Sequence, residues 1–260
     1  MLLEQGEVLG RAIGGAVEQS WPLARGLLTD PVRGVRIEAA SLLSAMPQDH
    51  LSPADRDRLS RAIDDYVAAQ RLNADRPESR VNLGNLYAQQ GRLAEAEAEY
   101  RAARALDAGF TPVYVSLAQL YARQGRDADG ERILGEALAR MPDDTELRLA
   151  LGLNLVRQHR PGDALAEIAR AAEIDPGNAR YAYICAVALN SAGRTDDAIK
   201  TLEASHGRHP ADRDTLLALV TINRDVGRNA AALTWADRLA AVDASARSLV
   251  DQLRQSAPSR

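Results

Sequence analysis

Few side chains in this sequence have types and spacings that suggest chemistry. The single cysteine, Cys185, lies in the apolar stretch 183–187, which predicts a buried thiol rather than a reactive one, and no disulfide. His206 and His209 have the spacing of a metal-binding pair, but a glycine and a proline end the helix there, which favours a helix-terminal charge instead. No phosphate-binding loop, nucleophile elbow or dinucleotide fingerprint occurs. We therefore predict a protein that is not an enzyme and that needs no metal or cofactor.

The composition favours closely packed helices. Apolar residues make up 46% of the chain and aromatic residues only 4%, so alanine and leucine must form most of the core. The formal net charge of −4 lacks the basic excess of nucleic-acid binders. No apolar run reaches the roughly 20 residues that span a bilayer, and the first residues do not resemble a signal peptide. We expect no nucleic-acid partner and no membrane insertion, and a cytoplasmic location unless the chain is a fragment of an exported protein, which would be periplasmic.

A period of 34 residues supplies the elements that would position any binding side chain. Small residues recur at positions 8, 20 and 27 of the units, where two helices must cross closely, and larger ones at positions 11 and 24. The last unit departs from this rule, with Val220 at position 8, Leu239 at position 27 and Ala236 at position 24. Position 15 is glycine in four units and His159 in one, and glycine readily adopts the left-handed conformation that ends a helix. The five contiguous units are 77–110, 111–144, 145–178, 179–212 and 213–246.

This pattern resembles the tetratricopeptide repeat (TPR) family, which shares the small positions and the proline at position 32. The resemblance implies an all-α fold, a right-handed α-solenoid of antiparallel helix pairs. It also implies a non-catalytic scaffold that binds a peptide or a partner protein in its concave groove. The tryptophan that the family carries at position 4 is absent from all five units. Val220 and Asn223, at packing positions of the last unit, predict looser packing there.

The N-terminal segment 1–53 differs from the repeats. Residues 23–43 resemble one HEAT repeat, in which an Asp-Pro turn joins two helices and a Val-Arg pair opens the second. Asp30 and Arg36 hold the places that pair with neighbouring repeats in a polar ladder. A further helix is expected over residues 3–18. We expect this segment to form a helical layer in front of the solenoid.

Two shorter segments flank the five units. Residues 54–76 fit the second helix of a preceding unit, whose first helix is interrupted by Pro47 and Pro53. Residues 247–260 form a predicted capping helix and tail that cover the apolar face of the last unit. We expect Trp235 to pack near that end rather than to bind a ligand.

The succession of a HEAT-like segment and TPR units also resembles the C-terminal part of bacterial multihaem c-type cytochromes. Those proteins attach haem through Cys-x-x-Cys-His motifs, and none occurs here because Cys185 stands alone. We expect no haem, but an accessory role beside such a redox protein is one alternative function. Self-assembly into a homo-oligomer through the N-terminal layer or the solenoid end is another.

In stacked helix pairs the first helix of each unit lines the concave face, with positions 2, 5, 9, 12 and 13 pointing into the groove. Amide side chains there bind a peptide backbone, arginines pair with acidic groups, and apolar side chains form pockets. Val81 replaces the lysine with which chaperone-binding members grip a C-terminal carboxylate, so we do not expect that mode. The candidate groove residues are Asn85, Gln89, Gln119, Arg123, Leu153, Arg157, Tyr183, Asn190 and Arg224.

Overall fold

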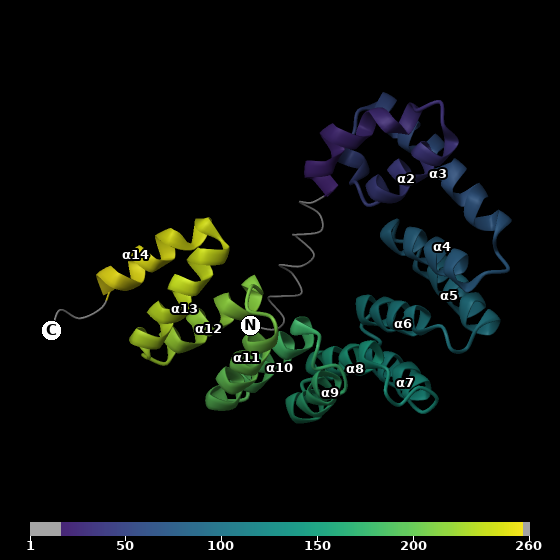
Figure 1. The fold of residues 1–260 in the computed structure, drawn as a ribbon. Coiled ribbons are helices and arrows are strands. Elements are labelled where there is room, and N and C mark those ends of the chain that lie inside the picture. The colour runs from purple at the N-terminus through teal and green to yellow at the C-terminus, as the bar shows by residue number, and fades with distance from the viewer. Residues whose placement is uncertain (1–16, 257–260) are drawn as a thin grey trace. The chain divides into compact units, whose positions relative to one another are not determined.

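The computed structural model describes residues 17–256, and every regular element in that range is helical (Figure 1). Residues 17–24 are helical and lead into η1, so the predicted helix 3–18 lies almost wholly outside the described residues. The first elements are η1 (Arg25–Thr29), α2 (Arg33–Leu43), η2 (Gln48–His50), α3 (Pro53–Leu72), α4 (Pro77–Gln89), α5 (Leu93–Leu106), α6 (Thr111–Arg123) and α7 (Asp127–Leu138). They are followed by α8 (Thr145–Arg157), α9 (Pro161–Ile174), α10 (Ala179–Ser191), α11 (Thr195–Arg208), α12 (Arg213–Asp225), α13 (Asn229–Val242), η3 (Ala244–Ala246) and α14 (Arg247–Ser256).

The contacts divide the chain into two compact units, residues 1–141 and 142–260. In the first unit α2 packs on α3, α4 pairs with α5, and α6 pairs with α7. In the second unit the pairs are α8 with α9, α10 with α11, and α12 with α13, and α14 packs on α13. The prediction of an all-α solenoid of helix pairs is therefore confirmed. The boundaries predicted for the segments and for the five repeats stay predictions.

Helix starts follow from local capping chemistry. The side chains of Ser52, Asp144, Asn178 and Asp212 each accept a hydrogen bond from a backbone N–H in the first turn of α3, α8, α10 and α12. Proline stands at the first or second position of α4, α6 and α9, where its missing N–H costs nothing. These residues make each helix begin where the repeat needs it.

The turn inside each helix pair is closed by a residue with left-handed backbone. Gly91, Gly125, Gly193 and Gly227 have φ between 68° and 76°, and His159 has φ 58°. For a residue other than glycine this conformation costs roughly 1–2 kcal/mol. The sequence interpretation of position 15 is confirmed, and the third pair keeps the same turn although it lacks the glycine.

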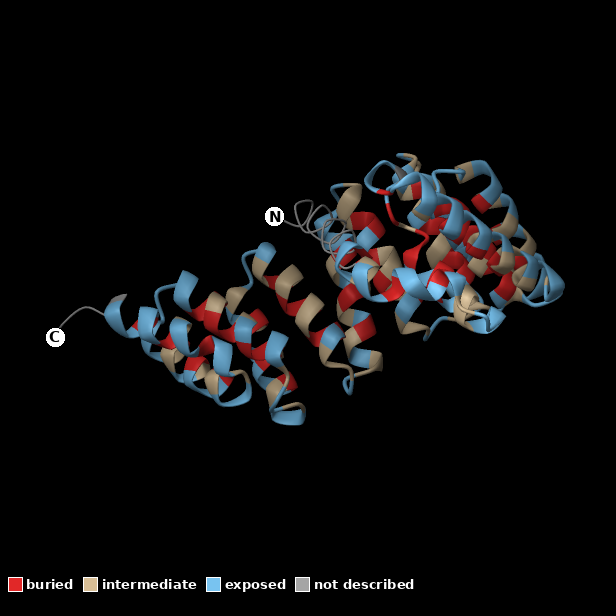
Figure 2. Ribbon diagram, turned by 90° about the horizontal axis from the view of Figure 1, so that it is seen from above, coloured by how far each residue is buried: buried red, intermediate tan, exposed pale blue. Residues whose placement is uncertain are grey.

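Helix pairs are held together by small side chains facing large ones. Every residue at positions 8, 11, 20, 24 and 27 of the five units is buried, and Figure 2 shows buried residues running along the helices. A Cβ on Gly84 would lie only 2.6 Å from Cδ1 of Tyr100, and one on Gly152 only 2.6 Å from Cγ1 of Ile168. These two crossings leave no room for a side chain.

The last helix pair does not show the looser packing that the sequence predicted at Val220 and Asn223. Val220 is fully buried, and Asn223 is 2% exposed with its amide donating to the carbonyl of Leu219 at 2.8 Å. The prediction of looser packing is therefore wrong at these positions, because the backbone bond satisfies the buried amide.

The C-terminal helix α14 buries Val250 and Leu253 against Val220 and Ala236. Trp235 packs on the same clusters, as expected. Its ring meets that of His206 edge-on, with centroids 5.1 Å apart, and the guanidinium of Arg238 lies 4.5 Å from its centroid. The apolar end of the last helix pair is thus covered.

The N-terminal layer is tied to α3 by ion pairs. Arg36 bonds Asp65 of α3 at 2.8 Å and Arg33 bonds it at 3.2 Å, and the hydrogen bond from Arg36 is the largest cause that lowers the pKa of Asp65. The carboxylate of Asp30 instead accepts the N–H of Val32 at 2.8 Å, at the start of α2. Of the two residues expected to form a polar ladder, only Arg36 reaches a neighbouring helix through its side chain.

We predict that Gly84→Ala destabilises the protein by about 1–2 kcal/mol, because overlap with the Tyr100 ring outweighs the better helix propensity of alanine. Gly135→Ala is the matched control, since Gly135 lies in α7 with nothing within 4 Å of an added Cβ. It should stabilise the protein by up to about 1 kcal/mol. Urea unfolding followed by circular dichroism measures both changes, and shifts of the same sign would contradict the close crossing.

Candidate partner-binding groove

The candidate groove lies on the first helices of the pairs, and each compact unit carries its own part. In the first unit α4 lies beside α6. In the second unit α10 lies beside α12, and Thr145 at the start of α8 donates to the hydroxyl of Tyr181 in α10 at 3.1 Å. The first helices of each unit therefore form a row, and their groove positions can act together within that unit.

In the first unit the two candidate amide side chains of α4, Asn85 and Gln89, are already engaged. Oδ1 of Asn85 accepts from the hydroxyl of Tyr100 at 2.7 Å, and Oε1 of Gln89 accepts from Oγ of Ser44 at 2.6 Å. Both residues are exposed, so their NH₂ groups can still donate. Of the amides expected to bind a peptide backbone, Asn85 and Gln89 thus each have one acceptor site already in use.

The other two candidates of this unit, Gln119 and Arg123 of α6, are exposed. Arg123 lies close enough to Tyr100 for its charge to act on that hydroxyl. Burial nevertheless raises the pKa of Tyr100 to about 12, against the opposing effects of Ser116 and Arg123. Tyr100 therefore stays neutral beneath Asn85 at physiological pH.

The second unit presents an apolar row. Leu153 of α8 is 37% exposed and Leu217 of α12 is 39% exposed, both at groove positions. Tyr183 of α10 is half-buried and lines a pocket of about 150 Å³. The remaining walls of this pocket are Ala179, Arg180, Asp212 and Asp214. One aromatic ring, two carboxylates and one guanidinium thus surround a small cavity.

Three further candidates lie in the same unit. Oδ1 of Asn190 accepts from Oγ1 of Thr195 at 2.9 Å, so one acceptor site of its amide, like that of Asn85, is already in use. Arg157 is half-buried. Arg224 is exposed and pairs with its neighbour Asp225 at 2.9 Å, a contact that a ligand carboxylate can replace.

The pocket walls were missed as a site from the sequence, although Arg180 and Asp214 occupy groove positions. The sequence did contain a signal for this pocket. Arg180 and Asp214 stand at position 2 of consecutive units, and Asp212 is a residue type that commonly caps a helix N-terminus. The partner of Gln89 had no such signal, since Ser44 lies outside the 34-residue period.

The residues first considered for chemistry belong to the packing. Cys185 is 5% exposed, and burial raises the pKa of its thiol, as expected of a buried cysteine. Burial, and then the charge of Arg238, lower the pKa of His206, so it carries less helix-terminal charge than the sequence suggested. Among residues 17–256 no group of three or more His, Cys, Asp or Glu side chains is placed to hold a metal ion. No helix in that range has the length and apolar character needed to cross a bilayer.

Comparison with known proteins agrees with this architecture. A family model described as tetratricopeptide repeat matches residues 54–109, 115–179 and 149–213, more than half of the chain. The solved structure of YrrB, "a TPR protein with an unusual peptide-binding site", is 20% identical, with 72% of this chain and 96% of that chain covered and a TM-score of 0.51. MamA is 16% identical, with 64% and 97% covered and a TM-score of 0.53.

Yeast Tom70 is 14% identical and has a TM-score of 0.61. The similarity covers 92% of this chain but 59% of Tom70. No curated protein sequence matches the chain. At these identities the solved structures establish a shared fold.

The raised pKa of Tyr100 predicts a loss of stability in alkali. Between pH 10 and 12 the unfolded chain releases this proton while the folded chain keeps it, so the free energy of unfolding falls as pH rises. The contribution is complete below pH 10 and amounts to up to about 2–3 kcal/mol. Urea unfolding of Tyr100→Phe at pH 9 to 12 should show a shallower fall than the unsubstituted protein, and parallel curves would contradict the assignment.

Proposed function

This chain belongs to the tetratricopeptide repeat family, and from that premise we propose that it is a scaffold that holds a peptide segment of a partner protein in the groove of its second unit. The observation that carries this proposal is the apolar row of Leu153, Tyr183 and Leu217. Large apolar side chains that are exposed or half-buried at groove positions of successive first helices are typical of binding surfaces. The similarity to YrrB, described as having a peptide-binding site, supports the same class of ligand.

The chemistry of the groove defines the ligand that fits it. The pocket beside Tyr183 has about 150 Å³, on the order of five water volumes, which suits one apolar side chain of moderate size. Arg180 and Asp214 at its rim offer one group of each charge. The amide of Asn190 donates hydrogen bonds to a peptide carbonyl. The expected ligand is an extended or helical peptide with one apolar anchor and charges of both signs around it.

A peptide-display experiment tests this function. A phage library of random peptides is selected on the whole chain, and the affinity of the best synthetic peptide is measured by calorimetry. We predict that Leu217→Ala and Tyr183→Ala each weaken binding about tenfold or more, because each removes a central apolar contact.

Val242→Ala is the matched control, since Val242 is an apolar residue of the same unit, 46% exposed, at the end of α13 and outside the groove positions. It should leave the affinity unchanged, and circular dichroism confirms that all variants are folded. Equal effects of Leu217→Ala and Val242→Ala would contradict a groove site.

A further inference from the structure

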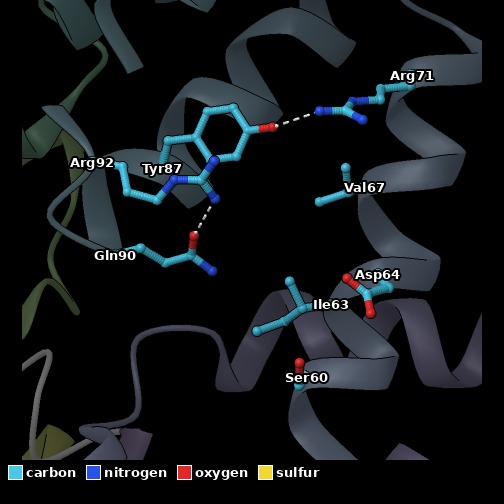
Figure 3. Close-up of a pocket in the computed structure, with 8 residues that line it drawn as sticks. All are labelled: Ser60, Ile63, Asp64, Val67, Arg71, Tyr87, Gln90 and Arg92. Atoms are coloured by element: carbon cyan, nitrogen blue, oxygen red, sulfur yellow. Dashed lines mark hydrogen bonds between the residues drawn. The ribbon is translucent and has the colours of Figure 1, made fainter. Parts of the chain in front are cut away.

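An open cavity of about 480 Å³ lies in the first unit between α3 and the turn that joins α4 to α5 (Figure 3). Ile63 and Val67 of α3 form its apolar wall. Arg71, Tyr87 and Arg92 gather at one end in Figure 3, whereas Asp64 and Ser60 lie at the other. This cavity does not include any candidate groove residue.

The next helix junction, between α5 and α6, has a tyrosine and an arginine at the same repeat positions and shows how a carboxylate can bind both. The guanidinium of Arg126 lies 4.4 Å from the ring centroid of Tyr121. The carboxylate of Glu97 in α5 accepts from the hydroxyl of Tyr121 at 2.9 Å, from Arg126 at 3.3 Å and from Arg101 at 2.6 Å. One carboxylate thus joins an aromatic hydroxyl and two arginines across the junction.

The α3–α4 junction has the same contact between a tyrosine and an arginine but lacks the carboxylate. Arg92 lies 4.2 Å from the ring centroid of Tyr87, and it bonds Glu95 and Gln90 just as Arg126 bonds Asp129 and Gln124. One period before Glu97, however, the chain has Ile63. The cavity lies beside this residue.

Arg71 supplies the second arginine at the α3–α4 junction. Its Nη2 lies 3.4 Å from the hydroxyl of Tyr87, and it contacts no carboxylate within residues 17–256. Since Arg92 is already paired with Glu95, the cationic end of the cavity has about one positive charge that no neighbouring carboxylate balances. A hydroxyl and two guanidinium groups converge there on a position that one acceptor group can fill.

We propose that this cavity binds a single carboxylate, the side chain of a glutamate or aspartate, in the place that Glu97 fills at the next junction. The carboxylate accepts from Arg71, Tyr87 and Arg92, and its methylene groups pack on Ile63 and Val67. A phosphate fits less well, because it carries nearly two negative charges and Asp64 lines the same cavity. The acidic residue comes from a partner protein, whose negative charge complements the unbalanced guanidinium of Arg71.

An NMR titration of the whole chain with N-acetylglutamate amide tests the proposal, and N-acetylglutamine amide serves as the neutral probe. We expect saturable shifts at the amides of Tyr87, Gln90 and Arg92 with the charged probe only. Arg71→Gln should weaken binding about tenfold or more, because it removes a charged hydrogen bond. Arg61→Gln, an exposed arginine of the same helix outside the cavity, is the control and should change nothing.

Ile63→Glu supplies the missing carboxylate from within the chain. It should abolish the response to the probe and melt at a higher temperature than Ile63→Gln, which differs from it only in charge. If the probe binds Glu4→Gln/Glu7→Gln but not the unsubstituted protein, the chain's own glutamates fill the cavity, which overturns the assignment to a partner protein. Equal responses to both probes, or undiminished binding by Arg71→Gln, would overturn it, as would no saturable binding in either background.

Discussion

The close crossing of the two helices in each pair is the constraint on which the rest of the structure depends. At Gly84 and Gly152 the first helix approaches a large side chain of the second so closely that no Cβ fits, and alanine or valine holds the corresponding place elsewhere. This contact fixes which side of the first helix is buried. An adjoining side is left to carry exposed residues such as Leu153 and Leu217. Packing therefore creates the proposed binding face as a consequence of the repeat.

Much of the fold could be predicted because the residues that pack the helices recur at fixed positions of the repeat. Small residues, large residues and left-handed turn positions recur every 34 residues, and even His159 keeps the turn. The site was harder to predict, since exposure and hydrogen bonding depend on neighbours that the period does not show. Asn85 and Asn190 were expected as clamps, yet Tyr100 and Thr195 use their oxygens. Such contacts depend on side-chain reach rather than on residue type.

Departures from the period are the most informative positions in a repeat protein. A residue type that all units share at one position indicates a role in packing. A residue type that differs between units indicates a contact particular to that unit. Position 21 follows no single rule, since it is glutamate in two units and leucine or isoleucine in three, and Ile63 stands where the next unit has Glu97. The arginine and tyrosine that would bind the carboxylate remain. Asn223 breaks the apolar rule at position 11 but is satisfied by a backbone carbonyl. A cavity lies beside Ile63, whereas Asn223 is buried.

Hydrogen exchange of the whole chain, with and without a peptide selected on it, tests the central claim that the first helices of the second unit form the binding face. Binding should slow exchange in α8, α10 and α12 and leave α9, α11 and α13 nearly unchanged, because ligand contacts stabilise the helices that they touch. Protection confined to the second helices of the pairs, or to the first unit alone, would contradict the account.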